Sequence, residues 1–258
     1  MTALFNNIIF GPIHSRRLGI SLGVNLLPTH SKLCNFDCIY CECGWNGDNR
    51  SAGAQFNSRE DVNAMLEQTL QKMSAEGQLP DVITFAGNGE PTLHPKFECI
   101  IEDTIILRDK YAPKAKVSVL TNAATLHRED VVRALKRVDN NILKLDSAFD
   151  VTARLMNNPA SSSYSIAKVV EQMMTFGGDL IVQTMFLRGS YNGQHIDNTT
   201  PEEVSAWLAL IAKISPRQVM VYSIDRDTPC HTIEKVSRED MLAIASQVER
   251  LGIRCSVA

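Results

Sequence analysis

The sequence lacks the features that mark membrane proteins, secreted proteins and non-specific nucleic-acid binders. Within its 258 residues no apolar run approaches the roughly 20 residues that a membrane-spanning helix needs. It has no basic tail or lysine-rich run, and its formal net charge is −3, which argues against non-specific binding to nucleic acid. Residues 1–17 have neither the basic lead nor the cleavage-like site of a secretion signal. We therefore expect a cytoplasmic protein with no membrane partner, in which thiols stay reduced.

Paired metal-binding histidines are also missing, because none of the six histidines belongs to an H-x-x-x-H pair or a similar spacing. Cysteines, by contrast, are clustered. The chain has seven of them, an odd number, and four fall within residues 31–45, SKLCNFDCIYCECGW. In a reducing compartment such a cluster indicates metal or redox chemistry before disulfides.

Short apolar, β-branched runs alternate with longer segments of helical spacing along the whole chain. The short runs predict strands at 20–26, 82–86, 116–121, 142–147, 179–186 and 218–224. The longer segments predict helices at 58–76, 95–110, 127–137, 163–177, 201–214 and 237–251. This alternation implies an α/β fold with a parallel sheet, outer helices and right-handed crossovers. Six units without a dinucleotide-binding fingerprint favour an open or partial barrel in a single domain over residues 1–258, and a further run at 252–257 can add a C-terminal edge strand.

Cys34, Cys38 and Cys41 form a C-x3-C-x2-C triplet just after the first predicted strand, and it has three interpretations. The spacing can place three small side chains on one buried helical face, but the turn-forming residues nearby disfavour a helix. A structural zinc ion with Cys43 as its fourth ligand is the second interpretation. Zinc sites usually cross-link two ligand pairs that lie far apart in the sequence, whereas these four cysteines lie within ten residues and would connect no distant segments. A [4Fe–4S] cube held by three thiolates leaves one iron open to a ligand. We favour the cluster, with Cys43 as a bystander thiol.

The triplet, with Tyr40 before its last cysteine, resembles the signature loop of the radical S-adenosylmethionine (radical SAM) enzymes. The resemblance implies that the open iron binds the amino and carboxylate groups of S-adenosylmethionine (SAM). One electron then cleaves SAM to methionine and a 5′-deoxyadenosyl radical, which takes hydrogen from a substrate. It also implies a partial (β/α)6 barrel, which agrees with the six units counted above, and an external electron donor of the flavodoxin or ferredoxin type.

The segment FAGNGEPTLHP, residues 85–95, follows the second predicted strand and resembles the family's GGEP element, with Asn88 in place of the middle glycine. Gly87 and Gly89 can adopt positive φ and let the backbone approach a ligand closely. The resemblance implies that the Glu90 carboxylate accepts a hydrogen bond from the ammonium group of SAM. An ordinary Gly-Asn-Gly turn with a solvated glutamate is the alternative.

Three further strand ends resemble family segments that contact the cofactor. They give as candidates Thr121, Asn122, Asp146, Ser147 and Gln183. The resemblance places Asp146 and Ser147 at the ribose and Gln183 at the adenosine. For each of them, a polar residue that merely ends a strand is the alternative.

Residues 10–28, 182–189 and 221–229 resemble, more specifically, a stand-alone branch of the family that is related to wyosine-base synthases. Those enzymes rebuild a methylated guanine in transfer RNA with pyruvate. A pyruvate Schiff base needs a lysine of lowered pKa, for which Lys32 and Lys144 are candidates. The extra amino-terminal cysteines of the archaeal tRNA enzymes are absent, because no cysteine precedes Cys34, so a tRNA base is one substrate option among several.

Other charged groups near the expected site have two interpretations. Arg16, Arg17 and Arg226 can clamp a phosphate or carboxylate of a substrate, or can be plain surface charge. Lone histidines such as His94 are more often hydrogen-bonded structural groups than catalysts.

Together these patterns predict a radical SAM iron–sulfur enzyme whose substrate, a small molecule, an RNA or a protein, the sequence does not identify. Within enzymes, the alternative is an activase that installs a glycyl radical on a partner protein. From another class, the alternative is a zinc-stabilised binding module.

Overall fold

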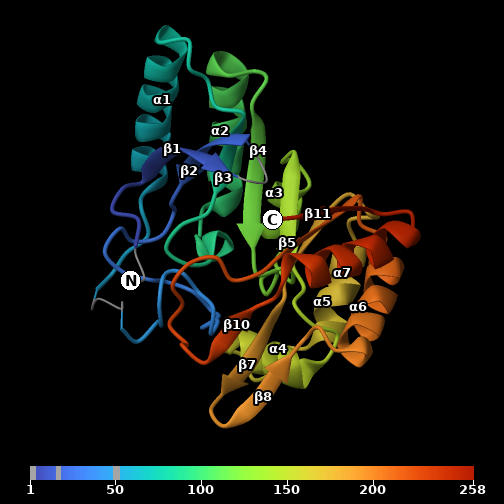
Figure 1. Ribbon diagram of the computed structural model, residues 1–258. Coiled ribbons are helices and arrows are strands. Elements are labelled where there is room, and N and C mark those ends of the chain that lie inside the picture. The colour runs from blue at the N-terminus through green and yellow to red at the C-terminus, as the bar shows by residue number, and fades with distance from the viewer. Residues whose placement is uncertain (1–3, 16–18, 49–52) are drawn as a thin grey trace.

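The computed structural model describes residues 4–15, 19–48 and 53–258. Its centre is an eight-stranded sheet in which every neighbouring pair from β2 to β11 is parallel and β1 is antiparallel to β2 (Figure 1). The strand order is β1 (Ile9–Ser15), β2 (Gly19–Val24), β3 (Val82–Phe85), β4 (Lys116–Thr121), β5 (Asn140–Lys144), β6 (Ile181–Met185), β9 (Gln218–Tyr222) and β11 (Arg254–Val257).

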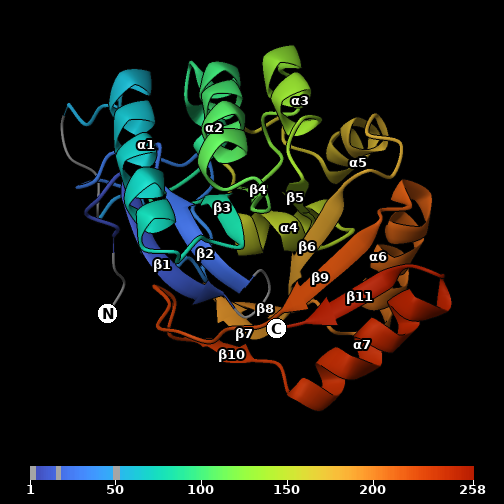
Figure 2. The same ribbon diagram turned by 90° about the horizontal axis from the view of Figure 1, so that it is seen from above.

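The sheet curves into an arc whose two edges, β1 and β11, do not pair with each other (Figure 2). Helices cover its convex outer side, as seen in the same view. They are α1 (Arg59–Ala75), α2 (Phe97–Tyr111), α3 (Glu129–Leu135), α5 (Ile166–Met174), α6 (Pro201–Ile214) and α7 (Arg238–Arg250). The architecture is therefore an α/β fold with an open, mostly parallel sheet.

Local sequence explains where these elements form. All four residues of β3 are buried, as expected for a parallel strand covered on both faces. Helix α1 begins after Ser58, whose side chain accepts a hydrogen bond from the Asp61 backbone N–H and so satisfies one of the free donors at the helix start. Helix α6 begins with Pro201, directly after Thr200, whose side chain accepts a hydrogen bond from the Glu203 backbone N–H and so caps the helix in the same way.

The strands and helices expected from the sequence are all found, with ends that differ by a few residues. The extra run at 252–257 is confirmed as an edge strand, because β11 pairs in parallel with β9. The parallel α/β fold of the partial-barrel type is confirmed as well.

Several elements were not expected from the sequence, and most of them lie at the carboxyl ends of the parallel strands, toward the lower end of Figure 1. They are β1 at the sheet edge, the turn η1 (Pro91–Leu93), helix α4 (Asp150–Asn157) and a three-stranded sheet of β7 (Leu187–Tyr191), β8 (Gln194–Asp197) and β10 (Ile233–Lys235). Of the helices that the structure describes, none has both the length and the apolar character needed to cross a bilayer.

Candidate functional site

The cysteine-rich segment 31–45 forms an irregular loop beyond β2 that contains turns but no helix. The interpretation of the triplet as one face of a buried helix is therefore wrong. Two neighbours fix the loop. Leu33 donates to the Asn88 carbonyl oxygen (2.8 Å) and accepts from the Glu90 N–H (3.1 Å), and Ile39 donates to the Met156 carbonyl oxygen at the end of α4 (3.0 Å).

One cavity of about 220 Å³ brings together most of the residues expected from the sequence. This cysteine cavity is lined by Cys34, Cys38, Tyr40, Cys41, Cys43, Gly87, Gly89, Glu90, Thr121, Asn122, Lys144 and Gln183, among others. Sheet register explains the convergence, because Thr121 lies opposite Leu143, and Lys144 lies opposite Gln183, at the carboxyl ends of adjacent strands. Ligands of parallel sheets bind at this edge.

Gly87 and Gly89 are needed for the chain's own packing. They have φ values of +144° and +137°, which side-chain-bearing residues rarely adopt. A Cβ atom on Gly89 would lie 1.9 Å from the Leu33 carbonyl oxygen, and one on Gly87 would lie 2.4 Å from Asn25 Oδ1. The close approach expected from the sequence therefore exists, but it is an approach to the cysteine loop and to Asn25, which places the thiols against the strand ends.

Asn88, which departs from the family pattern, has a structural task. Its side chain is fully buried, donates to the carbonyl oxygens of Phe5 (2.9 Å) and Pro28 (2.8 Å), and accepts from the Phe5 N–H (2.8 Å). A glycine could make none of these side-chain bonds. Asn88 therefore ties the amino-terminal segment to the loop after β3.

Glu90 is the centre of a buried hydrogen-bond network. Its Oε1 accepts from the Thr92 hydroxyl (2.6 Å), the Thr92 N–H (3.1 Å) and the Thr121 hydroxyl (2.6 Å), whereas Oε2 accepts from the Asn122 N–H (2.7 Å). Burial raises the pKa of Glu90 above its usual range, although these bonds, led by that from Asn122, act in the opposite direction. Because a carboxylate oxygen can accept two bonds, Oε2 is the atom with room for one more donor.

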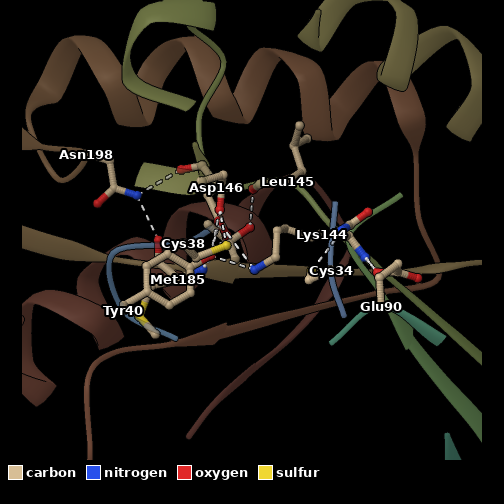
Figure 3. A network of polar contacts seen from close by, with 12 residues as sticks. Cys34, Cys38, Tyr40, Glu90, Lys144, Leu145, Asp146, Met185 and Asn198 are labelled. Carbon is tan, nitrogen blue, oxygen red and sulfur yellow. Dashed lines mark hydrogen bonds and ion pairs between the residues drawn. The ribbon is translucent and has the colours of Figure 1, made fainter. Parts of the chain in front are cut away.

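A second network joins Tyr40, Lys144 and Asp146 on the other side of the cavity (Figure 3). Lys144 Nζ donates to the Tyr40 hydroxyl (2.6 Å), which donates to the Asp146 carboxylate, and Nζ also lies 3.4 Å from Asp146 Oδ2. Burial disfavours the charge on Lys144, but Asp146, Tyr222 and Cys38 together outweigh it and raise the pKa of Lys144. Cys38 Sγ is joined to the same network through a bond to Asn157 Oδ1 (3.3 Å), which also lies 2.9 Å from the Tyr40 hydroxyl.

The structure does not place Asp146 and Ser147 among the lining of the cysteine cavity. Asp146 also accepts from the Met185 N–H (2.9 Å), and Ser147 donates to Glu203 Oε2 (2.8 Å) on α6. Contact of these two residues with a ribose stays a prediction, which their present bonds do not favour. Gln183, by contrast, lies in the cavity wall.

Asn198 is a residue that sequence reasoning missed. It is buried and donates to the carbonyl oxygens of Asp146 and Met185, both at 2.8 Å, while its Oδ1 accepts from the Leu187 N–H (2.9 Å). It therefore joins the ends of β5 and β6 beside the lysine network (Figure 3). No local pattern distinguishes it from any other loop asparagine.

The donor set of the cavity fits an iron–sulfur cluster. Burial raises the pKa of Cys38 to about 12 and raises that of Cys34 further, so these thiols favour the neutral form unless a cation replaces the proton. The hydrogen bond with Cys43, opposed by burial and aided by Lys32, lowers the pKa of Cys41 to about 6. Among the residues that the structure describes, no three His, Cys, Asp or Glu side chains could hold a single metal ion. The thiolates of a cubane bind different iron atoms and so need not converge on one point.

Neither lysine proposed for a Schiff base has the lowered pKa that such chemistry needs. Although burial opposes the charge of Lys32, its neighbouring cysteines and Asp37 raise its pKa. The pKa of Lys144 is also raised, for the reasons given above. Lys32 is fully buried and donates to the Gly44 carbonyl oxygen (2.6 Å) and to Asp37 (3.1 Å). These bonds tie Lys32 to the cysteine loop. A lysine with a raised pKa stays protonated, and a protonated amine is not a nucleophile.

Of the remaining candidates, Arg226 and His94 do not line the cysteine cavity. Arg226 forms an exposed ion pair with Glu42 (2.8 Å), and Arg16 and Arg17 lie outside the described residues. His94 is buried, its Nε2 lies 2.9 Å from the Asn57 carbonyl oxygen, and its Nδ1 accepts from the Lys96 N–H (3.1 Å). These bonds agree with the expectation that this histidine is a structural group.

Comparison with known sequences gives a family match for most of the chain. The profile of the Radical SAM superfamily matches residues 29–200. A UPF0026 protein of Methanocaldococcus jannaschii is 35% identical over 184 residues, which make up 70% of this chain and 54% of that protein. A UPF0026 protein of Helicobacter pylori (strain J99) is 30% identical over 254 residues, 95% of this chain and 75% of that protein. The chain thus spans little more than half the length of the archaeal relative.

Comparison with solved structures gives the same fold at low identity. A radical SAM methyltransferase from Sphaerobacter thermophilus matches with a TM-score of 0.69 and 12% identity, covering 92% of this chain and 65% of that one. A structure of TYW1 with a lysine–pyruvate adduct bound matches with a TM-score of 0.59 and 13% identity, covering 89% of this chain and 73% of that one. At these identities the matches show a shared fold alone.

Proposed function

This chain belongs to the radical SAM superfamily and to the UPF0026 family, and from this membership we propose that Cys34, Cys38 and Cys41 hold its [4Fe–4S] cluster for the reductive cleavage of SAM. Membership makes the chain an enzyme with a [4Fe–4S] cluster and SAM as its cofactors. When bound, these cofactors supply a one-electron cleavage that yields a radical able to take hydrogen from a substrate.

The cysteine cavity is the observation that carries this proposal. Four thiols from one loop, three of them the proposed ligands, and polar side chains from four strand ends line a single cavity at the carboxyl edge of the sheet. The Leu33–Gly89 contact holds the thiols beside Glu90, which lines the cavity and whose Oε2 can accept one further bond, from an ammonium group. On the side of the cavity away from Glu90, the hydrogen bonds of Tyr40 and Asp146 position the Lys144 ammonium group, which can bind an anionic group of a ligand. The chain's own share of the chemistry is this orientation, together with exclusion of water by the buried lining.

Anaerobic reconstitution with iron and sulfide, followed by SAM and dithionite, tests the proposal. We expect a brown protein with broad visible absorption that converts SAM to methionine and 5′-deoxyadenosine, both measured by chromatography. A colourless protein that holds stoichiometric zinc would instead support the zinc-stabilised module and would overturn the proposal.

A base in transfer RNA is the first substrate to test, on the strength of the resemblance to wyosine-base synthases. The raised pKa values of Lys32 and Lys144 give no support to a pyruvate Schiff base at either lysine. Turnover with deuterated tRNA is expected to move deuterium into 5′-deoxyadenosine, as measured by mass spectrometry. Label that arrives only from a deuterated glycyl-radical enzyme would support the activase instead.

Replacing Glu90 with glutamine is expected to weaken SAM binding by roughly 10- to 100-fold, because a charge-assisted hydrogen bond to an ammonium contributes about 1.5–3 kcal/mol. The dissociation constant is measured anaerobically on cluster-loaded protein of equal iron content. Glu203→Gln is the matched control, because Glu203 is also buried and hydrogen-bonded, to Ser147 and Thr152, but does not line the cysteine cavity. Equal SAM affinity in the two variants would remove Glu90 from the proposed site.

A further inference from the structure

A second cavity, of about 460 Å³, lies beside the cysteine loop. This outer cavity is lined by Asn35 and Phe36 of that loop, by Leu93, by residues between 124 and 128 after β4, and by residues between 159 and 172 before and within α5. None of the functions described above uses it. Phe36 belongs to the linings of both the outer cavity and the cysteine cavity, so the two cavities adjoin at this residue.

Two short paths lead from the outer cavity to the first cysteine. The Phe36 N–H points at Cys34 Sγ (3.4 Å). The Asn35 side-chain oxygen accepts from Asn122 Nδ2 (2.6 Å), which also lies 3.8 Å from Cys34 Sγ. Electron transfer between proteins falls off steeply with distance and proceeds best along bonded and hydrogen-bonded paths. An electron that enters at Asn35 or Phe36 would therefore need to pass only one or two contacts to reach a metal-bound sulfur.

The charges around the outer cavity favour an acidic partner. The lining contains His127, Arg128 and Lys168 but no Asp or Glu. Arg128 is already paired with Asp130 (2.5 Å), whereas Lys168 is exposed and has no ion pair among the residues that the structure describes. Behind the rim, Arg154 gives its hydrogen bonds to the carbonyl oxygens of residues 161–164, so its positive charge also lacks a carboxylate partner there.

The rest of the lining is suited to a protein–protein contact. Its accessible lining is mostly apolar, although Phe36 and Val169 within it are themselves largely buried, and the lining also includes three serines. An apolar centre inside a polar rim is the usual composition of an interface. A rim whose charges are all positive raises the rate at which a negatively charged partner associates.

We propose that the outer cavity is the docking site of the electron donor, an acidic carrier protein that presents a one-electron group at its surface. The proposal rests on the proposed function, because it assumes that a cluster is held by Cys34 and its companions. In the transfer step the donor loses one electron and the cluster gains it, and no bond in this chain is made or broken.

Lys168→Glu tests the proposal through binding, with a purified flavodoxin and a purified ferredoxin as the two probes. We expect the dissociation constant of the cluster-loaded protein for its preferred donor to rise roughly three- to tenfold at low salt, and the difference to shrink at high salt. Adding Ser163→Glu on the same rim is expected to weaken the complex further. Lys114→Glu is the matched control, since Lys114 is also exposed but precedes β4, at the opposite end of the sheet.

Reduction kinetics separate a failure of this inference from a failure of the proposed function. With the donor, bleaching of the visible absorption is expected to slow in Lys168→Glu, whereas dithionite, which needs no docking site, is expected to reduce both proteins at the same rate. A protein that takes up no cluster would contradict the proposed function and the inference with it. A cluster that forms normally, with donor binding unchanged in Lys168→Glu and in the double variant, would overturn the inference alone. Loss of tRNA affinity in these variants without loss of donor affinity would assign the cavity to RNA instead, and binding of neither donor at low salt would also overturn the inference.

Discussion

Replacing Cys38 with alanine is expected to leave the protein colourless after anaerobic reconstitution and unable to convert SAM to 5′-deoxyadenosine. Cys38 lines the cysteine cavity between its two companion thiols in the sequence, and a cube that loses one of its three thiolates keeps only two protein ligands. Iron and sulfide content, together with visible absorption, measure the result directly. Loss of the cluster here is the largest functional effect that we expect from any single substitution.

The fold is expected to survive that change. Cys38 is buried, so removal of its sulfur leaves a small void, which typically costs about 1 kcal/mol. Asn157 Oδ1, which accepts from Cys38, keeps its contact with the Tyr40 hydroxyl. The metal-free forms of the wild type and the variant should therefore have similar thermal unfolding midpoints. A large fall in the midpoint would mean that misfolding, and not the missing ligand, removes the cluster.

Cys43→Ala is the matched control, because Cys43 lines the same cavity and is buried to a similar degree. Its Sγ lies 3.5 Å from the Gly87 carbonyl oxygen and is hydrogen-bonded to Cys41 as a donor. We expect the brown colour and the iron content to be retained in this variant. If Cys43→Ala loses the cluster while Cys41→Ala keeps it, the third ligand is Cys43 and the assignment from spacing is wrong.

The sequence predicted the parallel sheet and its outer helices because those elements bury long periodic faces. Strand β3 is apolar at nearly every position, and α1 and α6 carry clear capping residues at Ser58 and Thr200. Helix α4 was missed for the opposite reason. It has only eight residues, no side-chain cap at its start, and an apolar face that depends on contacts with the cysteine loop.

The β7–β8 hairpin was missed although its signal is present. Asn192 and Gly193 both have positive φ, +51° and +74°, as the tight turn of a hairpin requires, and Asn-Gly is the strongest short signal for such a turn. The interpretation of 182–189 as one strand end with a loop behind it overlooked this pair. The hairpin and β10 together make up the small sheet beside the site.

The candidate site likewise has features that the sequence predicted and features that it did not. Spacing and resemblance predicted that the thiols, Glu90 and the ends of β4 and β6 would meet, because parallel strands carry their carboxyl ends to one edge. They did not predict which partner each side chain would take. Ser147 bonds to Glu203, which lies 56 residues later, and such a pairing depends on the packing of α6, which no local pattern contains.

Gly89→Ala is expected to lower the free energy of unfolding by about 3 kcal/mol, from backbone strain at a φ of +137° and from steric overlap. The new methyl group would meet the Leu33 carbonyl oxygen at 1.9 Å, and this atom is backbone, which cannot rotate away as a side chain can. In a protein of this size the thermal midpoint of the metal-free form should fall by roughly 6 to 12 °C. Because Leu33 directly precedes Cys34, the displacement should also impair uptake of the cluster.

Gly47→Ala shows whether that loss comes from the loop contact or from glycine replacement in general. No atom lies within 4 Å of a Cβ placed on Gly47, so its alanine variant should unfold within about 0.5 kcal/mol of the wild type. If Gly89→Ala has the same midpoint and iron content as Gly47→Ala, then the loop after β3 can move away from Leu33 at little cost. In that case the thiols are not held rigidly beside Glu90, and the geometry that relates the metal ligands to the acceptor for the SAM ammonium group would have to arise when the cofactors bind.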